Sequence, residues 1–350
     1  MDVLSHLKTL VSAPGLSAHE APIRDLIREA WTPLADEMGG DRLGSLWATK
    51  HGKGKSPRNK IMLAAHMDSI GLMVKRVREG FLWVTQIGGV DARVMPGQPV
   101  LVHGRQALPG VVTSTPPHLL PPGDRDKAVR LDDLIIDVGL PPEQVEKLVR
   151  VGDLISFAQP SFEMQGDWLV AKSLDNRASV AAVTACLDAL QGRTHTWDVV
   201  AVATAQEEET FGGASASAFS LAPDLAIAVD VTFASGPGLP EHKTFSLGDG
   251  PTIGWGPNLH PKLHKALADA AAKAEIPYRL EVMPMHSGTD AYAIQVSREG
   301  IPTAVIGLPL KHMHTPVEVV SIKDVTRAGR LMAEFITQLD DEFLNTLALD

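Results

Sequence analysis

The sequence predicts an α/β fold in which a mostly parallel sheet is sandwiched by helices and interrupted by a small inserted β-barrel. From about residue 165 onward, short apolar runs alternate with helical segments, which is typical of parallel strands joined by helices. Between residues 71 and 164, valine-rich runs alternate with Gly and Pro breaks, which indicates short strands and turns. We therefore expect residues 1–70 and 165–350 to form one domain around a β-rich insertion at 71–164.

The start of the chain is expected to contribute two helices and one strand. The first 35 residues predict two helices separated near Pro14. Ser17 is a candidate N-cap of the second helix, because Glu20 stands three residues later as in a capping box. The apolar run that follows Lys60 predicts a buried strand ending at His66.

The later elements follow from the same two patterns. In the β-rich segment only residues 143–150, which follow two prolines, look helical. The elements expected beyond it are helices at 176–190, 260–275 and 322–339 and strands at 199–205, 225–229 and 303–306. Strands that alternate with helices in this way predict a sheet covered on both faces.

Composition limits the classes of protein to consider. The 350 residues are 44% hydrophobic with a formal charge of −10, which suits a globular protein and argues against nucleic acid or anionic membranes as partners. The single cysteine, Cys186, lies in an alanine-rich helical stretch and is expected to pack rather than react. The N-terminus lacks the pattern of a secretory signal and no apolar run reaches membrane-spanning length, so we expect a cytoplasmic protein.

Metal-ligand residue types stand where the predicted strands end. His66 ends the first strand, Glu207 and Glu208 follow the second, Asp230 follows the third, and His314 lies in the loop after the fourth. In open α/β sheets, ligands bind beyond the carboxyl ends of the strands, so these side chains are expected to converge.

The segment His66-Met67-Asp68 places two polar groups on the same side of an extended chain. We interpret His66 as a metal ligand whose second ring N–H is accepted by Asp68. An isolated pair of this kind is more often a surface feature. The apolar residues on both sides of this pair favour the metal site.

Asp175 and Asn176 precede a predicted helix, where N-capping is the commoner role for such residues. Asp175 also has one oxygen for each of two metals. Both roles could hold together, with Asn176 as the cap and Asp175 as a bridge.

Glu207-Glu208-Glu209 resembles a solvated charge run, but it follows a buried strand and precedes Phe211 and two glycines. Adjacent glutamates in a turn can divide two tasks. Glu207 would be a general base and Glu208 a metal ligand, while Glu209 is expected to face solvent.

Two further positions are less specific. Asp230 at a strand end is as often a turn residue as a ligand, and spacing does not choose between His312 and His314. A serine hydrolase is disfavoured because no G-x-S-x-G turn is present.

The residues above match a known pattern nearly end to end. The chain resembles the TET-type aminopeptidases, family 42 of the metallopeptidases, some members of which are labelled endoglucanases. Seven blocks carry the resemblance: His66–Val74, Gly88–Val94, Leu174–Arg177, Gln206–Glu208, Val229–Thr232, Ser287–Ala291 and Met313–Glu318.

The resemblance implies a role for each residue. The implied ligands are His66, Asp175 and Asp230 for one metal, and Asp175, Glu208 and His314 for the other. Asp175 would bridge the metals, Glu207 would be the general base and Asp68 would orient His66. The ions would be two divalent metals, with Zn²⁺ suited to mixed N and O ligands and Co²⁺ or Mn²⁺ as alternatives.

The resemblance also implies short peptides as substrates, a dimerisation role for residues 71–164 and a homo-oligomer in the form of a tetrahedral dodecamer. The chain departs from the pattern in two places. The segment Glu209–Ala214 lacks an arginine that relatives commonly carry, and Lys311-His312 stands where relatives often have Arg-Tyr. Both changes lie beside the expected metal site and leave the preferred N-terminal residue open.

Three rival functions are weighed against an aminopeptidase. A metal-dependent deacylase of small acylated amino acids would use the same site. A glycoside hydrolase could use two carboxylates, but sugar clefts favour aromatic platforms and this chain is 5% aromatic. A structural shell protein would have no reason to keep Glu207 together with the ligand set.

Overall fold

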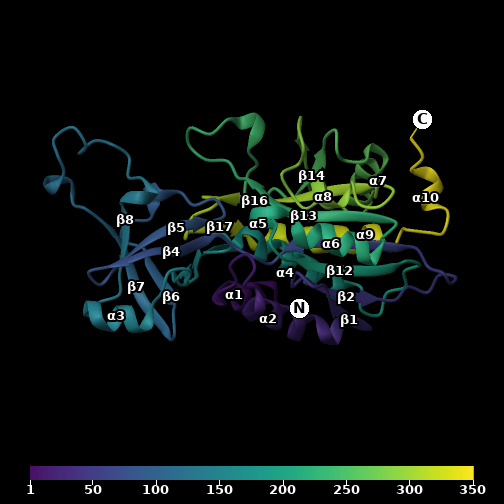
Figure 1. Cartoon of the computed structure of the whole chain (residues 1–350). Coiled ribbons are helices and arrows are strands. Elements are labelled where there is room, and N and C mark those ends of the chain that lie inside the picture. Colours follow the sequence, from purple (N-terminus) through teal and green to yellow (C-terminus); the bar gives the residue numbers. More distant parts are fainter. Residues whose placement is uncertain (350) are drawn as a thin grey trace.

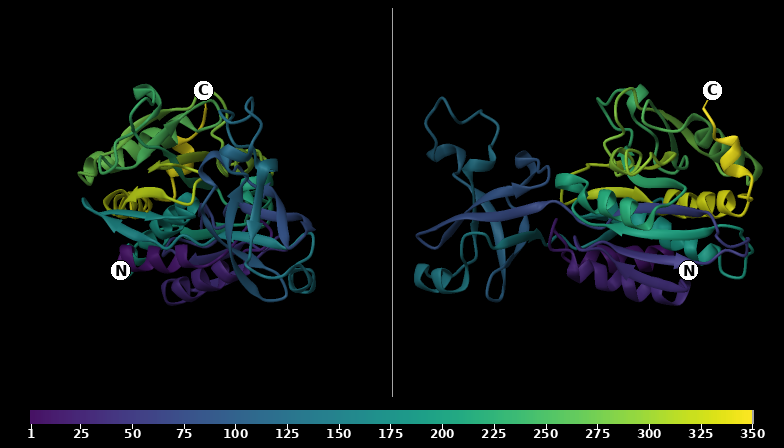
Figure 2. Two further views of the ribbon diagram at one scale, coloured as in Figure 1. Left: turned by 90° about the vertical axis from the view of Figure 1, so that its left-hand side faces the viewer. Right: turned by 45° about the vertical axis from the view of Figure 1, so that its right-hand side comes forward.

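The computed structural model describes residues 1–349 and has the predicted fold class: a large α/β part and an inserted barrel. In Figure 1 the barrel, which contains β4 (Gly71–Arg78) and β7 (Ala107–Ser114), lies to the left of the α/β part. The two views of Figure 2 show the same arrangement from other directions.

The α/β part is built on one mixed sheet, which has eleven strands within the described residues. Along its main path the strands are β1 (Glu37–Gly40), β2 (Leu46–Lys50), β12 (Asp198–Thr204), β3 (Lys60–His66), β13 (Leu225–Phe233), β16 (Thr303–Lys311), β17 (Glu318–Ser321), β11 (Trp168–Ala171) and β10 (Phe162–Met164). Two more, β14 (Thr252–Trp255) and β15 (Arg279–Val282), branch from β16. The central strands β12, β3, β13 and β16 are parallel, and antiparallel strands flank them.

Helices cover both faces of this sheet because its central strands are apolar on both sides. The helices of this part are α1 (Val3–Ser12), α2 (Ala21–Trp31), α4 (Leu174–Ala189), α5 (Glu207–Thr210), α6 (Gly212–Leu221), α7 (Pro261–Lys273), α8 (Ala291–Ile294), α9 (Ile322–Ile336) and α10 (Phe343–Thr346). Ile61 and Leu63 of β3 pack into a core with α1, α2, α4, α7 and α9, whereas Met62 and Ala64 pack into a second core with α6 and α8.

The inserted segment closes into a six-stranded antiparallel barrel. Its strands, in the order in which they pair, are β4, β5 (Phe81–Ile87), β8 (Leu134–Asp137), β7, β6 (Pro99–His103) and β9 (Leu154–Phe157). One short helix, α3 (Pro142–Leu148), lies beside it. The next strand, β10, belongs to the main sheet, so the barrel ends at Phe157.

The structure confirms some of the local features predicted from the sequence and contradicts one. The two N-terminal helices, the strand ending at His66 and the buried position of Cys186 are confirmed. The capping box is wrong: α2 begins at Ala21, and Ser17 makes no cap to it. No helix within residues 1–349 is long and apolar enough to cross a membrane.

Candidate metal centre

The main sheet and its connections bring all the predicted ligand positions together. His66 ends β3, Asp175 lies at the start of α4, and Glu207 and Glu208 begin α5, just beyond the end of β12. His314 lies in the turn between β16 and β17.

Asp230 is where the sequence interpretation needs correction. It does not follow a strand that ends at residue 229, because β13 continues to Phe233. The parallel ladder pairs Ala228 with Ala64, and His66 and Asp230 each lie two residues further along. Side chains two apart share a face, so Asp230 and His66 project on the same side of neighbouring strands.

Asp175 lies between the two histidines. One carboxylate oxygen, Oδ1, lies 3.2 Å from Nε2 of His66, and the other, Oδ2, lies 3.4 Å from Nε2 of His314. His312 is exposed to solvent. Of the two histidines that spacing left open, His314 is therefore the one that faces the acidic cluster.

Three more carboxylates complete the cluster. Asp230 and Glu207 each place an oxygen 3.7 Å from Nε2 of His66, and Glu208 places one 3.6 Å from Nε2 of His314. Two sets of side chains offer donor atoms that lie within 4.8 Å of one another: His66 with Glu207 and Asp230, and His66 with Asp175 and Glu208. The first set includes Glu207, which the resemblance makes a base rather than a ligand.

The carboxylates of this cluster are suited to bind cations. Burial raises the pKa values of Glu207 and Asp230 well above the ordinary range, and those of Glu208 and Glu318 also rise mainly through burial. Oxygen Oε1 of Glu208 is buried without a hydrogen-bond partner. Crowded, buried carboxylates with unused oxygens are stabilised by divalent metals, so the donor set fits a pair of such ions.

Asp68 links the first strand to the glutamate turn. Its Oδ1 accepts a hydrogen bond from the backbone N–H of Glu207 at 3.0 Å, and its Oδ2 accepts one from the Ser17 hydroxyl at 2.6 Å. Its backbone oxygen lies 3.2 Å from Nδ1 of His66. The hydroxyl that was expected to cap α2 thus supports the cluster.

Glu318 is a buried residue that the ligand assignment missed. One of its oxygens accepts from the backbone N–H of Asp175 at 3.1 Å, and the other accepts from that of His314 at 2.9 Å. It closes the block Met313–Glu318, but nothing in the sequence indicated that it faces Asp175. Asn176, the expected cap, instead donates its side-chain amide to the carbonyl of Val229 at 2.9 Å.

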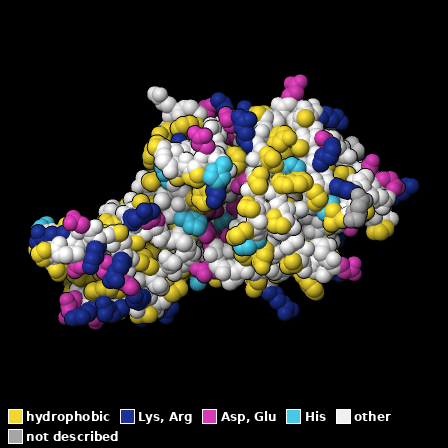
Figure 3. All heavy atoms as spheres, turned by 90° about the horizontal axis from the view of Figure 1, so that it is seen from above, with side chains coloured by type: hydrophobic (Ala, Val, Ile, Leu, Met, Phe, Trp, Pro, Cys, Tyr) yellow, Lys and Arg dark blue, Asp and Glu magenta, His cyan; other side chains and the backbone are white. Residues whose placement is uncertain are grey.

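The cluster opens into a cavity of about 450 Å³. Acidic and histidine side chains gather around this hollow when the molecule is seen from above (Figure 3). The wall beyond the cluster includes Phe233 of β13, Val305 of β16 and Met283, which directly follows β15.

Comparison with known proteins places this geometry in a family. The model of the M42 glutamyl aminopeptidases matches residues 44–331. The chain belongs to this family. It is 36% identical to a lysyl aminopeptidase from Pyrococcus furiosus over 95% of this chain and 96% of that protein. It is 29% identical to a glutamyl aminopeptidase from Lactococcus lactis over 98% of each chain. The M42 chain is accordingly a metallo-aminopeptidase, which removes N-terminal residues from peptides.

Solved structures agree with the M42 assignment. A TET aminopeptidase from a marine sediment archaeon of the Thaumarchaeota superimposes with a TM-score of 0.94 at 32% identity over 99% of both chains. The TET1 peptidase of Pyrococcus horikoshii, described as assembling into a tetrahedron or a large octahedral shell, has a TM-score of 0.84 at 29% identity over 97% of this chain and 100% of its own. A Thermotoga maritima structure labelled endoglucanase has a TM-score of 0.78 at 28% identity over 98% of this chain and 99% of its own.

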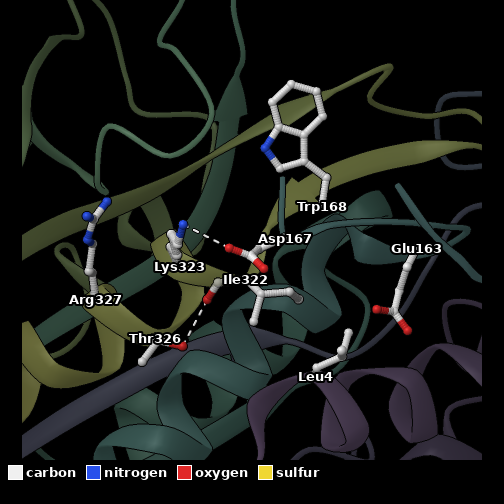
Figure 4. Close-up of a pocket in the computed structure, with 8 residues that line it drawn as sticks. All are labelled: Leu4, Glu163, Asp167, Trp168, Ile322, Lys323, Thr326 and Arg327. Carbon is white, nitrogen blue, oxygen red and sulfur yellow. Dashed lines mark hydrogen bonds and ion pairs between the residues drawn. The ribbon is translucent and has the colours of Figure 1, made fainter. Parts of the chain in front are cut away.

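This aminopeptidase has a second cavity, of about 310 Å³, between α1, β11 and α9. Its charged groups are already paired: Lys323 lies 2.8 Å from Asp167 (Figure 4), Glu163 is paired with Lys8, and Arg327 is paired with Asp324. It lacks the histidines and clustered carboxylates of the metal centre.

Proposed function

We propose that this aminopeptidase hydrolyses the first peptide bond of short peptides at a two-metal centre, with Glu207 as general base. The observation that supports this most directly is Asp175, whose two oxygens face two different histidines. A ligand that bridges two metals offers one carboxylate oxygen to each ion, and Asp175 is oriented in this way.

The ligand set that we propose is His66, Asp175 and Asp230 for one ion, and Asp175, Glu208 and His314 for the other. Mixed imidazole and carboxylate donors favour Zn²⁺, with Co²⁺ or Mn²⁺ as alternatives. When bound, the ions supply polarisation of the scissile carbonyl and a lower pKa for the attacking water.

Glu207 is suited to move the proton of that water. Its carboxylate is buried at the cluster, and burial raises its pKa, so it holds a proton more readily than an exposed glutamate. In the proposed reaction it takes the proton from the attacking water and delivers it to the leaving amine.

Asp68 and Glu318 would act as positioning residues. Asp68 holds the backbone of Glu207 beside His66, and Glu318 holds the backbones of Asp175 and His314. Outer hydrogen bonds of this kind fix the orientation of metal ligands.

We also propose that the chain forms a homo-oligomer, a tetrahedral dodecamer in which the β-rich segment 71–164 mediates dimerisation. The shell described for the Pyrococcus horikoshii relative supports the assembly. Twelve copies of a 37.5 kDa chain give about 450 kDa. A light-scattering mass near that of one chain would contradict the proposal.

The test is a substrate panel on metal-stripped enzyme, with Zn²⁺, Co²⁺ or Mn²⁺ added back separately. We expect aminoacyl anilides to be hydrolysed only after metal is restored. Hydrolysis of N-acyl amino acids but not of aminoacyl anilides would indicate a deacylase instead. Chelator-resistant cleavage of a β-glucan would indicate a glycoside hydrolase.

A further inference from the structure

The cavity holds one more carboxylate that the proposed mechanism does not use. Glu281, on the outer strand β15, lines the same cavity as the metal ligands. The hydroxyls of Thr232 and Thr252 each donate a hydrogen bond of 2.6 Å to it, one to each oxygen. Glu281 is therefore held in place from β13 on one side and from β14 on the other.

The backbone of β16 makes room for this arrangement. β16 lies between β13 and β14, and at its crossing point stands Gly307, which pairs with Asp230 on one side and Thr252 on the other. A Cβ atom at position 307 would lie 2.9 Å from Oε2 of Glu281. The glycine thus lets the Glu281 carboxylate pass over β16 to the hydroxyl of Thr232.

Thr232 connects this carboxylate to the metal centre. It lies two residues beyond Asp230 on β13, so the two side chains share one face of the strand. Glu281 is accordingly anchored on the same face as a proposed metal ligand, within one continuous cavity.

Glu281 has no cationic partner among residues 1–349. No Lys, Arg or His in this part of the chain forms an ion pair with it, and no Lys or Arg lines the cavity. The two threonine hydroxyls occupy only part of the four acceptor positions of a carboxylate. A half-buried carboxylate with free acceptor positions and no cationic partner can be stabilised by a cation that comes from outside the chain.

The surrounding wall suits the stem of a basic side chain. Phe233, Met283 and Val305 line the cavity together with Glu281. Lysine and arginine combine an apolar stem with a charged end, which matches an apolar wall that carries one carboxylate.

We infer that Glu281 binds the side-chain cation of the substrate's first residue, so that the enzyme prefers peptides that begin with Lys or Arg. This inference rests on the proposed aminopeptidase function and names its substrate class. It makes Glu281 the specificity-determining residue of the cavity.

The test compares anilides of lysine and norleucine on the metal-loaded wild-type enzyme. These substrates have the same four-carbon stem and differ in the terminal ammonium group. We expect kcat/KM to be at least about tenfold higher for lysine, as for a buried charge pair. An equal or higher value for norleucine would overturn the inference while leaving the aminopeptidase function intact. Failure of all aminoacyl anilides would overturn both.

Two variants locate the effect. Glu281→Gln should lower kcat/KM for the lysine substrate by at least about tenfold and leave the norleucine value unchanged. Glu209→Gln removes a charge from the same cavity, but the Glu209 carboxylate accepts a bond from the backbone N–H of Gly88, so the lysine-to-norleucine ratio should persist. An unchanged ratio in Glu281→Gln, or loss of the ratio in Glu209→Gln, would refute the role of Glu281.

Discussion

The two ends of the active-site cavity are built in different ways. At the metal end, side chains from four parallel strands and their connections crowd several buried carboxylates around two histidines. At the other end, the single carboxylate of Glu281 is held by two hydroxyls above a glycine. In our proposal, bound metals neutralise the negative charge at the metal end, and a cationic substrate side chain neutralises the single negative charge of Glu281.

The largest effect is expected from Asp175→Asn at the metal end. Asparagine keeps only one of the two carboxylate oxygens of Asp175 and lacks its negative charge. It therefore cannot bridge two metals, and metal binding should fail. We expect kcat/KM to fall by more than about 10³-fold, because bound metal contributes several kcal/mol to catalysis. Asp167→Asn, in the cavity of Figure 4, serves as the control and should retain full activity. Anilide kinetics on both variants check this.

At the metal end, the variant Glu207→Gln distinguishes a role in proton transfer from a role in metal binding. If Glu207 is the base, kcat should fall by at least about 10²-fold while metal content stays at the wild-type level. Elemental analysis alongside kcat makes the distinction. Loss of one metal would instead make Glu207 a ligand, as its grouping with His66 and Asp230 allows.

A smaller effect is expected from Glu318→Gln. The amide keeps one acceptor oxygen and loses the other, so the backbone of Asp175 or His314 loses its support. Metal affinity should fall by roughly 10–100-fold, the usual cost of removing such a partner. Glu281→Gln, at the far end, should leave the metal dissociation constant unchanged. A lower affinity in Glu281→Gln would show that the two ends are not independent.

The smallest effect is a pH dependence of substrate choice. Burial raises the pKa of Glu281, and the hydroxyls of Thr232 and Thr252 offset part of the rise. Below that raised pKa the carboxyl is neutral and attraction to a cation is lost, whereas lysine stays charged throughout the range. The lysine-to-norleucine ratio of kcat/KM should therefore be largest above that raised pKa and should fall as the pH is lowered through it. The ratio should be flat in Glu281→Gln, and a flat profile in the wild type would exclude this titration.

The same comparison explains what could be predicted from the sequence. At the metal end the side chains lie in or just beyond strands with strong apolar patterns, so the topology of a parallel sheet was enough to expect that His66, Glu208 and Asp230 converge. The end of β13 was misplaced because a charged residue inside a strand looks like its boundary.

The Glu281 end gave no such signal. β14 and β15 are four residues each, and Glu281 meets Thr232 only because β16 carries a glycine between them. Contacts across several strands depend on register, which the local pattern does not fix. The role of Glu318 could not be predicted for the same reason. Its partners are the backbone N–H groups of Asp175, which is distant in sequence, and of His314, which lies across a turn.

The most direct test of the two-metal proposal is a titration of metal-stripped enzyme with Zn²⁺, in which bound metal per chain and hydrolysis of lysine anilide are followed together. We predict that activity returns as metal binds and reaches its maximum at two ions per chain. Full activity in the stripped enzyme, or a maximum at one ion per chain, would contradict the proposal.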